Sequence, residues 1–422
     1  MIFDISWNPG IARFNRLKPI NFSVLFILYV VAANLFQILG IYTQYPGLDA
    51  LWKAIILMVL LMYAWHKAPR PLVVRPGYWL MFALLSLHQI LSPLITEDMP
   101  SGLGGITALV FPIISFFVFM ILLNKLELDR PQLDRLFKLL IGFVVFACLL
   151  NMVNNIEQIM SLSADVKAYE LAFSSFFDNR NTFGYYLFIS SAAFIYLLSQ
   201  KRYRKPGWLI LFGFILFNLV LTLSRTSILA TLVFLIVFTA VGFGLRPFLK
   251  VIAVLVFTLG ALLAVPSVRD FVVSNVVRED SGLSGRDEVY RESVNIWLES
   301  SVFVGAGFNE SQDKLESKTG YTSTHNTYLA LLIRGGAVLF TLFVFAILFS
   351  VSKIRAVLMR ERVVGGMLAG LLVAYLVYSM SESQILFFSS VPSFIASVTV
   401  IVLPLYLSNY YVNKSKKGGS YA

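Results

Sequence analysis

The sequence has one cysteine, three histidines and few charged residues, and each scarcity excludes a class of protein. Cys148 has no second cysteine with which to form an intrachain disulfide, and three histidines with one cysteine do not make a Cys/His zinc cluster. Charged residues make up 14% of the chain and hydrophobic residues 58%, whereas about 25% of a typical soluble domain is charged. This composition excludes a soluble protein. The 37 phenylalanines also exclude a disordered chain, which is polar and poor in aromatics.

Long hydrophobic runs dominate the sequence. A helix needs about 20 mostly apolar residues to cross the roughly 30 Å hydrocarbon core of a membrane. The sequence therefore predicts an all-α polytopic integral membrane protein with about twelve transmembrane helices. The first span follows Arg13, Arg16 and Lys18 and is too long for a cleaved signal peptide, so we expect it to be retained. The expected spans are residues 21–40, 49–66, 77–95, 103–123, 133–156, 182–199, 208–224, 226–245, 248–267, 326–350, 364–385 and 390–409.

The apolar run from residue 208 to residue 245 must contain two spans. As a single helix it would be about 57 Å long, nearly twice the hydrocarbon thickness. Basic residues flank both of its ends: Lys201, Arg202, Arg204 and Lys205 before it, and Arg246 and Lys250 after it. Because basic loops face the cytoplasm, both ends are expected there, with a turn near residues 222–227 on the outer side that contains Arg225.

The distribution of charge predicts the orientation of the whole chain. With both termini in the cytoplasm, every inside loop is net basic and the outer loops together are net acidic. The net charge of +11 then follows from topology, and nucleic acid is dropped as a partner. The chain divides into residues 1–267 with spans one to nine, an extracytoplasmic loop of short helices at 268–325, and residues 326–422 with spans ten to twelve and a basic cytoplasmic tail.

The loop before the tenth span is the longest polar stretch. Ser284 and Asp287 fit a capping box, and Tyr290, Val294 and Trp297 recur at helical spacing on one face. We expect a helix here whose apolar face packs on the bundle or lies in the membrane interface. Long loops usually carry function, so this loop is where candidate residues are sought.

Among the three histidines, only His325 has a mechanistic setting. It follows Ser323 and Thr324, either of which would cap the tenth helix, and the positive end of the helix dipole disfavours an imidazolium. A neutral ring there can accept a proton. The alternative is an interfacial histidine that hydrogen-bonds the loop. His66 and His88 fall at the cytoplasmic end of the second span and within the third.

Arginines expected on the outer face form a second group of candidates. Arg225 lies in the tight turn, Arg286 in the first turn of the loop helix and Arg180 just before the sixth span. The planar guanidinium donates two parallel hydrogen bonds and keeps its charge, which suits a pyrophosphate. The alternatives are that Arg225 snorkels to lipid headgroups and that Arg180 anchors the end of a span.

Two ionisable residues fall within the spans themselves. Arg334 is roughly 13 Å from His325 along the tenth helix, and Glu382 in the eleventh span is its expected partner. Function and a purely structural ion pair are both open for this pair. No outer loop contains the Asp-x-Asp or Glu-x-Asp pair that would hold Mg²⁺ or Mn²⁺ against a diphosphate, so we expect no metal and no cofactor.

Several short motifs follow one another along the chain. They are Asn179-Arg180-Asn181 before Gly184, Ser224-Arg225, Ser284-Gly285-Arg286 followed by Trp297, Val304-Gly305-Ala306-Gly307, and His325-Asn326-Thr327-Tyr328-Leu329 leading to Gly335-Gly336. Their order resembles the signature of the O-antigen ligase and O-antigen polymerase superfamily. A GT-C-like arrangement of about twelve spans, with a large outer loop before the tenth, also resembles that family.

The resemblance implies a metal-independent, inverting glycosyltransferase of the bacterial inner or cytoplasmic membrane. It would take a glycan from undecaprenyl pyrophosphate on the periplasmic or extracellular side. By position, His325 matches the family's general base, and Arg225 and Arg286 match its pyrophosphate-binding arginines, with Arg180 expected beside them. The implied partners are the lipid-linked glycan, an acceptor glycan or lipid A core, membrane lipid and other polysaccharide-assembly proteins.

Three positions are left as structural or acceptor-side candidates: Arg334, Glu382 and Asn326. Arg334 departs from the family pattern, in which an acidic or neutral residue is expected. Within the superfamily, a polymerase joins one lipid-linked repeat to another lipid-linked chain, whereas a ligase moves the finished chain to an acceptor such as lipid A core. No feature marks a dedicated lipid A core site, which favours a polymerase. A flippase would need polar residues along the membrane midplane and repeated halves, whereas the charges here cluster at the outer face.

Overall fold

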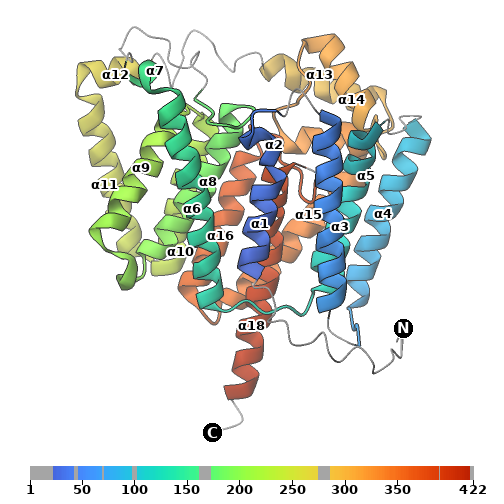
Figure 1. Cartoon of the computed structure of the whole chain (residues 1–422), viewed down its shortest axis with the longest axis horizontal. Coiled ribbons are helices and arrows are strands. Elements are labelled where there is room, and N and C mark those ends of the chain that lie inside the picture. The colour runs from blue at the N-terminus through green and yellow to red at the C-terminus, as the bar shows by residue number, and fades with distance from the viewer. Residues whose placement is uncertain are drawn as a thin grey trace.

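The computed structural model describes residues 22–41, 46–68, 71–96, 102–160, 173–273, 286–388 and 390–418. Within these ranges the chain forms helices joined by turns and loops, and its one β-bridge joins Ser301 to Gly305. The long helices run side by side as one bundle, and two shorter helices lie over one end of it (Figure 1). The prediction of an all-α polytopic membrane protein is confirmed.

The described helices match the predicted spans one by one. Among the described residues, nine segments are long and apolar enough to cross a membrane, and three apolar helices are shorter. The long ones are α3 (Pro46–Lys67), α4 (Pro76–Thr96), α5 with η3 (Gly102–Phe116, Phe117–Leu122), α6 (Arg130–Asn154), α8 (Arg180–Leu198), α10 (Arg225–Phe243), α11 (Leu245–Leu263), α15 (Thr327–Leu358) and α17–η8–α18 (Val391–Ser397, Val398–Val402, Leu403–Gly418). The shorter ones are α1 (Phe22–Ala33), α9 (Pro206–Leu221) and α16 (Arg362–Tyr378).

The remaining helices are short connections or lie at one end of the bundle. They are α2 (Leu35–Ile38), α7 (Ile156–Met160), η5 (Lys201–Tyr203), α12 (Pro266–Val272), α13 (Arg286–Glu299) and α14 (Phe308–Thr319). We call α13, α14 and the loop between them the cap, residues 286–319.

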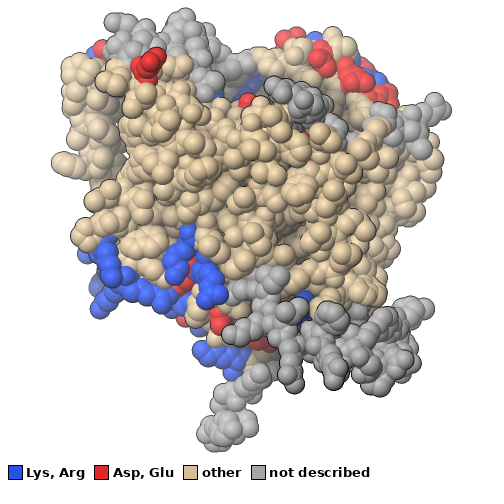
Figure 2. Space-filling view, in the orientation of Figure 1, with Lys and Arg blue, Asp and Glu red and all other residues tan. Residues whose placement is uncertain are grey.

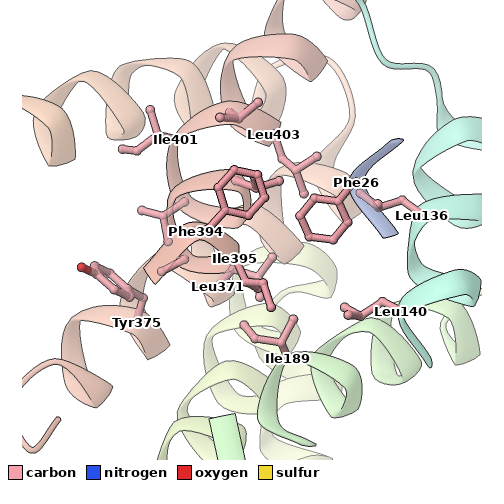
Figure 3. Close-up of a cluster of buried hydrophobic side chains, with 14 of the residues drawn as sticks. Phe26, Leu136, Leu140, Ile189, Leu371, Tyr375, Phe394, Ile395, Ile401 and Leu403 are labelled. Carbon is pink, nitrogen blue, oxygen red and sulfur yellow. The ribbon is translucent and has the colours of Figure 1, made fainter. Parts of the chain in front are cut away.

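The last span occupies the centre of the bundle and α11 its edge. The most apolar 18-residue window of α17–η8–α18 is entirely buried, whereas no residue of the corresponding window in α11 is. Phe26 of α1 stacks with Phe394 of α17, with 6.0 Å between ring centroids, and the same buried cluster includes Leu140 of α6, Ile189 of α8 and Tyr375 of α16 (Figure 3). A mostly apolar helix that the rest of the protein leaves unburied, such as α11, is suited to contact with lipid.

The apolar run from 208 to 245 divides as predicted. The chain turns at residues 222–224 between α9 and α10, and buried Leu223 has a left-handed φ of 49°. The Thr222 hydroxyl fastens the turn by donating to the Leu219 carbonyl (2.7 Å) and accepting from the Ser224 amide (3.3 Å). The predicted turn is confirmed, and Arg225 is the first residue of α10 rather than a turn residue.

The two ends of the bundle differ in charge. Figure 2 shows Lys and Arg gathered at the end opposite the cap and Asp and Glu gathered on the cap side. At the basic end, Arg202 pairs with buried Asp134 at the start of α6, and Arg362 donates to the Val241 carbonyl at the end of α10 (2.8 Å). This is the asymmetry that the sequence predicted.

The cap folds back onto α15. Val289 and Ile296 of α13 bury against Ala306, Leu315 and Ile333. The predicted loop helix is therefore confirmed, and its buried side is one position away from the predicted face. Of the predicted face, Tyr290 and Trp297 lie at the margins of the contact, and Val294 is exposed. The proposed cap residue Ser284 lies outside the described residues.

Two glycine motifs form the two sides of one contact. Gly336 breaks α15 with φ 59° and ψ −161°, and the cap loop occupies the break. Ala337 donates its amide to the Val302 carbonyl (2.9 Å), and Ala306 donates to the Ile333 carbonyl (2.7 Å). A Cβ on Gly305, whose φ is 77°, would lie 2.8 Å from the backbone at the α15 break, so no larger residue fits without movement. The glycines of 304–307 and 335–336 thus let two backbones touch.

Candidate active site

Glu382 is the centre of the site that the predicted residues form. It lies in the turn after α16 and is 7% exposed. Its Oε1 accepts a hydrogen bond from the Asn181 side chain of α8 (2.8 Å) and one from Arg286 of α13 (3.2 Å). Its Oε2 lies 3.7 Å from Nδ1 of His325. One buried carboxylate therefore joins α8, the cap and the start of α15.

Arg286 ties the cap to this centre. Besides the Glu382 carboxylate, it donates to the Ser381 carbonyl (3.0 Å), so its two terminal nitrogens bind one side chain and one backbone carbonyl in the turn after α16. One helical turn later, the Tyr290 hydroxyl lies 3.2 Å from the Met380 carbonyl and 3.4 Å from that of His325. Burial raises the pKa of Tyr290, against an opposing effect of Arg286, so the hydroxyl remains a donor at neutral pH.

His325 sits immediately outside α15 rather than within its first turn. The N-cap is Asn326, whose side chain accepts from the amides of Tyr328 and Leu329 (2.9 and 3.0 Å). The prediction that Ser323 or Thr324 caps this helix is therefore wrong. His325 has a left-handed φ of 47° and Asn326 is extended, so helical geometry begins only at Thr327. Asn326 is thus a structural residue of the site.

The strained backbone of His325 presents its ring to Glu382. Nδ1 is buried, and no described residue lies within hydrogen-bond distance of it, while the side chain as a whole remains 29% exposed. The ring also meets Tyr321 edge-on, with 6.2 Å between ring centroids. A non-glycine residue in left-handed geometry is uncommon and costs about 1–3 kcal/mol, and such strain concentrates at functional sites.

Arg180 and Arg225 are brought together by a close crossing of α8 and α10. A Cβ on Gly184 would lie 2.5 Å from the Ser227 hydroxyl oxygen, so only glycine allows this approach. Arg180 and Arg225 are the first residues of the two helices. Arg180 is close enough to Arg225, Arg286 and Glu382 for its charge to interact with theirs.

The structure thus assembles most of the predicted site and excludes one member. The first residue of the cap, Arg286, lies together with His325, Arg180, Arg225 and Glu382, and we call these five residues the cap-side cluster. It contains three guanidinium groups and one carboxylate. Such an excess of positive charge favours a ligand with more than one negative charge.

Arg334 does not join the cap-side cluster. The expected Arg334–Glu382 pair is wrong, because Glu382 is engaged by Arg286. The Arg334 guanidinium instead lies over the rings of Phe308 and Phe388, 4.6 and 5.6 Å from their centroids. In the described ranges, no three His, Cys, Asp or Glu side chains gather where they could hold a metal ion.

Comparison with known protein families gives a match over part of the chain that builds this site. Residues 210–344 match the O-antigen ligase family. The resemblance to the O-antigen ligase and polymerase superfamily is therefore confirmed. A search of the curated proteins found no match to the chain. The matched segment includes Arg225, Arg286 and His325, whereas Arg180 and Glu382 lie outside it.

The match to the O-antigen ligase family suggests the general class of activity. It supports a glycosyltransferase-like enzyme of polysaccharide biosynthesis, with a lipid-linked glycan and an acceptor as its partners. Together with the apolar helices, it indicates a bacterial membrane protein.

Sequence reasoning missed two residues that matter for the geometry. Asn181 was part of a motif but had no role, and it proves to hold Glu382 from α8. His88 was placed within a span and set aside, yet its Nε2 lies 3.0 Å from the Gly335 carbonyl at the break in α15. The sequence did contain a signal for His88. An ionisable residue within a membrane span costs free energy, so such a residue usually has a structural or functional role.

Proposed function

We propose that the protein is a metal-independent, inverting glycosyltransferase that moves glycan from undecaprenyl pyrophosphate to an acceptor hydroxyl, and that it works as a polymerase of lipid-linked repeats. The observation that carries the proposal is the cap-side cluster, in which one histidine faces a carboxylate beside three arginines. Its position at one end of the bundle, under the cap, suits a substrate whose lipid lies in the membrane and whose glycan lies outside it. A flippase would instead need charge along a midplane path.

His325 is the proposed general base. Glu382 faces Nδ1 and would orient the ring so that Nε2 takes the proton of the acceptor hydroxyl. The 3.7 Å separation is longer than a hydrogen bond, and catalytic hydrogen bonds often tighten only when substrate is bound. As the proton leaves, the hydroxyl oxygen forms a bond to the anomeric carbon, which inverts.

The arginines are the proposed stabilisers of the leaving group. The bond from the anomeric carbon to the pyrophosphate oxygen breaks, and undecaprenyl pyrophosphate departs with the electron pair. The negative charge that develops on its oxygens is offset by Arg180, Arg225 and Arg286. These cationic side chains would stabilise the leaving group as a bound metal ion does in metal-dependent enzymes. The N-termini of α8 and α10 bring backbone amides to the same region.

The basic end of the bundle is proposed to face the cytoplasm and the cap the outside, with both termini cytoplasmic. Single cysteines in a Cys148→Ser background test this, using exposed positions at the two ends. Asp313→Cys in α14 should react with an impermeant thiol reagent added to intact cells, and Lys201→Cys only after the membrane is opened. Equal labelling of both positions in intact cells would contradict this orientation.

The activity is tested with purified protein and a lipid-linked repeat, with and without lipid A core. We expect products of increasing glycan length from the repeat alone, and the same products in the presence of EDTA. Products that form only with lipid A core would make the protein a ligase. Activity that EDTA removes and Mg²⁺ or Mn²⁺ restores would contradict the arginine-based mechanism. Purified protein that transfers glycan to neither acceptor would contradict the transferase itself.

A further inference from the structure

A second polar chamber lies apart from the cap-side cluster, between α4, α5, α14 and α15. It is partly open and contains about 520 Å³ of space not filled by atoms. None of the five cluster residues lines it. Its polar lining consists of Arg334, His88, Gln89, Ser92 and Asn309.

Arg334 enters this chamber with its hydrogen-bonding capacity unused. The rings of Phe308 and Phe388 cover the face of its guanidinium, and an aromatic face accepts none of the five N–H bonds in the plane. Its Nε is buried without a hydrogen-bond partner, and Arg334 forms no ion pair with any residue in the described ranges. A guanidinium within a transmembrane helix is costly unless it is matched.

Among the described residues that line the chamber, no acid compensates for the arginine. His88 is 8% exposed and donates its Nε2–H to the Gly335 carbonyl (3.0 Å), so its buried Nδ1 is an acceptor that can take a hydrogen bond from a protonated phosphate oxygen. None of the described residues that line the chamber is acidic. Glu310, two residues after Phe308, pairs with Lys314 (2.6 Å). The chamber is therefore complementary to an anion.

An apolar groove continues from the chamber along the same two helices. It contains about 460 Å³ and shares Leu339 with the chamber. On α4 the lining passes from Ser92 and His88 in the chamber to Leu85 and Met81 in the groove. Along α15 the groove extends from Leu339 past Leu342 to Ala346, away from the cap. The polar part thus lies toward the cap end and the apolar part deeper in the bundle.

From this arrangement we propose that the chamber and groove form one binding site for a phosphate-bearing lipid. Arg334 binds the phosphate, and the hydrocarbon chain lies in the groove. The two cavities share Leu339, so one molecule can fill both. Helix α4 stands at the edge of the bundle, where a lipid can enter sideways (Figure 1). Free phosphate would fill only the chamber and leave the apolar groove without an occupant. The site goes beyond the glycan transfer reaction, and binding to it is measured without turnover.

The test uses the intact protein in lipid nanodiscs that contain traces of photoreactive lipids with identical acyl chains. Phosphatidic acid supplies the phosphate, and diacylglycerol and phosphatidylcholine are the neutral and zwitterionic controls. After illumination, labelled peptides are identified by mass spectrometry. We expect phosphatidic acid to label α4 and α15 at the groove and unlabelled phosphatidic acid to displace it, whereas inorganic phosphate leaves the label in place. Labelling of α11 should be alike for all three lipids, because that helix is unburied.

Arg334→Gln should weaken phosphatidic acid labelling of the groove by about tenfold to a hundredfold and leave α11 unaffected, because charged hydrogen bonds to the phosphate are lost. Arg334→Lys should lose less, since the charge remains but the fork does not. The matched control is Arg291→Gln, at a residue of α13 whose side chain is 70% exposed. If Arg334→Gln does not fold, the preference of the wild type for phosphatidic acid at the groove still decides the matter. Groove labelling that is equal for diacylglycerol, unchanged in Arg334→Gln or displaced by inorganic phosphate would overturn the proposal.

Discussion

Replacing His325 with alanine should lower the rate of glycan transfer by about 10²- to 10⁴-fold, which is the usual loss when a general base is removed. The thermal stability of the purified protein should change little, because the imidazole nitrogens make no hydrogen bond within the described residues and the side chain is 29% exposed. The measurement is the initial rate of transfer from a lipid-linked repeat, beside a melting curve of each variant.

Two variants separate catalysis from structure at this position. His66→Ala, near the basic end of α3, should keep wild-type activity because it lies at the opposite end of the bundle. Glu382→Gln should move the pH dependence of transfer, since the group facing Nδ1 is no longer charged, whereas a residue that only packs would leave the profile in place. A folded His325→Ala protein that transfers at nearly the wild-type rate would leave the mechanism without a base.

The transmembrane helices could be predicted from sequence because each carries its own signal. A run of apolar residues long enough to cross the hydrocarbon shows itself without reference to any partner, and even the division of 208–245 followed from length alone. The turn at 222–224 was found for the same reason. The apolar runs do not show how deep each span lies in the bundle. Helix α11 and the span α17–η8–α18 are both apolar, yet the first is unburied and the second is central.

The cap-side cluster was predicted in its members and less well in its contacts. Arg180, Arg225, Arg286 and His325 carry the motifs, but their proximity depends on the α8–α10 crossing at Gly184. The sequence interpretation paired Glu382 with Arg334, and spacing alone carried no signal that Arg286 would take that place. The break in α15 at Gly336 places Arg334 against the Phe308 ring. The docking of the cap brings Arg286 into an ion pair with Glu382.

The N-cap residue of α15 also could not be predicted from the sequence alone. Ser323, Thr324 and Asn326 are all residue types that cap helices well. The choice among them depends on the left-handed backbone of His325, which is held by the loop and by the turn after α16. Because tertiary contacts impose the left-handed backbone of His325, no local sequence pattern predicts it.

Replacing Arg225 with alanine should lower the rate of transfer by about 10²- to 10³-fold, as the loss of one donor to a developing anion usually does. Arg225 opens α10 at a tight, largely buried turn between α9 and α10. Arg225→Lys should restore activity only in part, because an ammonium retains the charge but cannot donate two parallel hydrogen bonds to a pyrophosphate. The measurement is kcat/KM for a lipid-linked donor, with melting curves as before.

Arg286 should respond differently from Arg225, and the difference tests the arrangement of the cluster. Arg286 donates to both Ser381 and Glu382, so Arg286→Ala removes a leaving-group stabiliser and also loosens the carboxylate that faces His325. We expect it to lose at least as much activity as Arg225→Ala and to lower the melting temperature as well, since Glu382 is left buried with less compensation. The control Arg291→Ala, on the same helix but largely exposed and paired with Glu292 at 3.5 Å, should change neither quantity. If Arg225→Ala instead melts early and transfers normally per folded molecule, Arg225 is an anchor of the α9–α10 turn, and the pyrophosphate must be held by Arg180 and Arg286 without it.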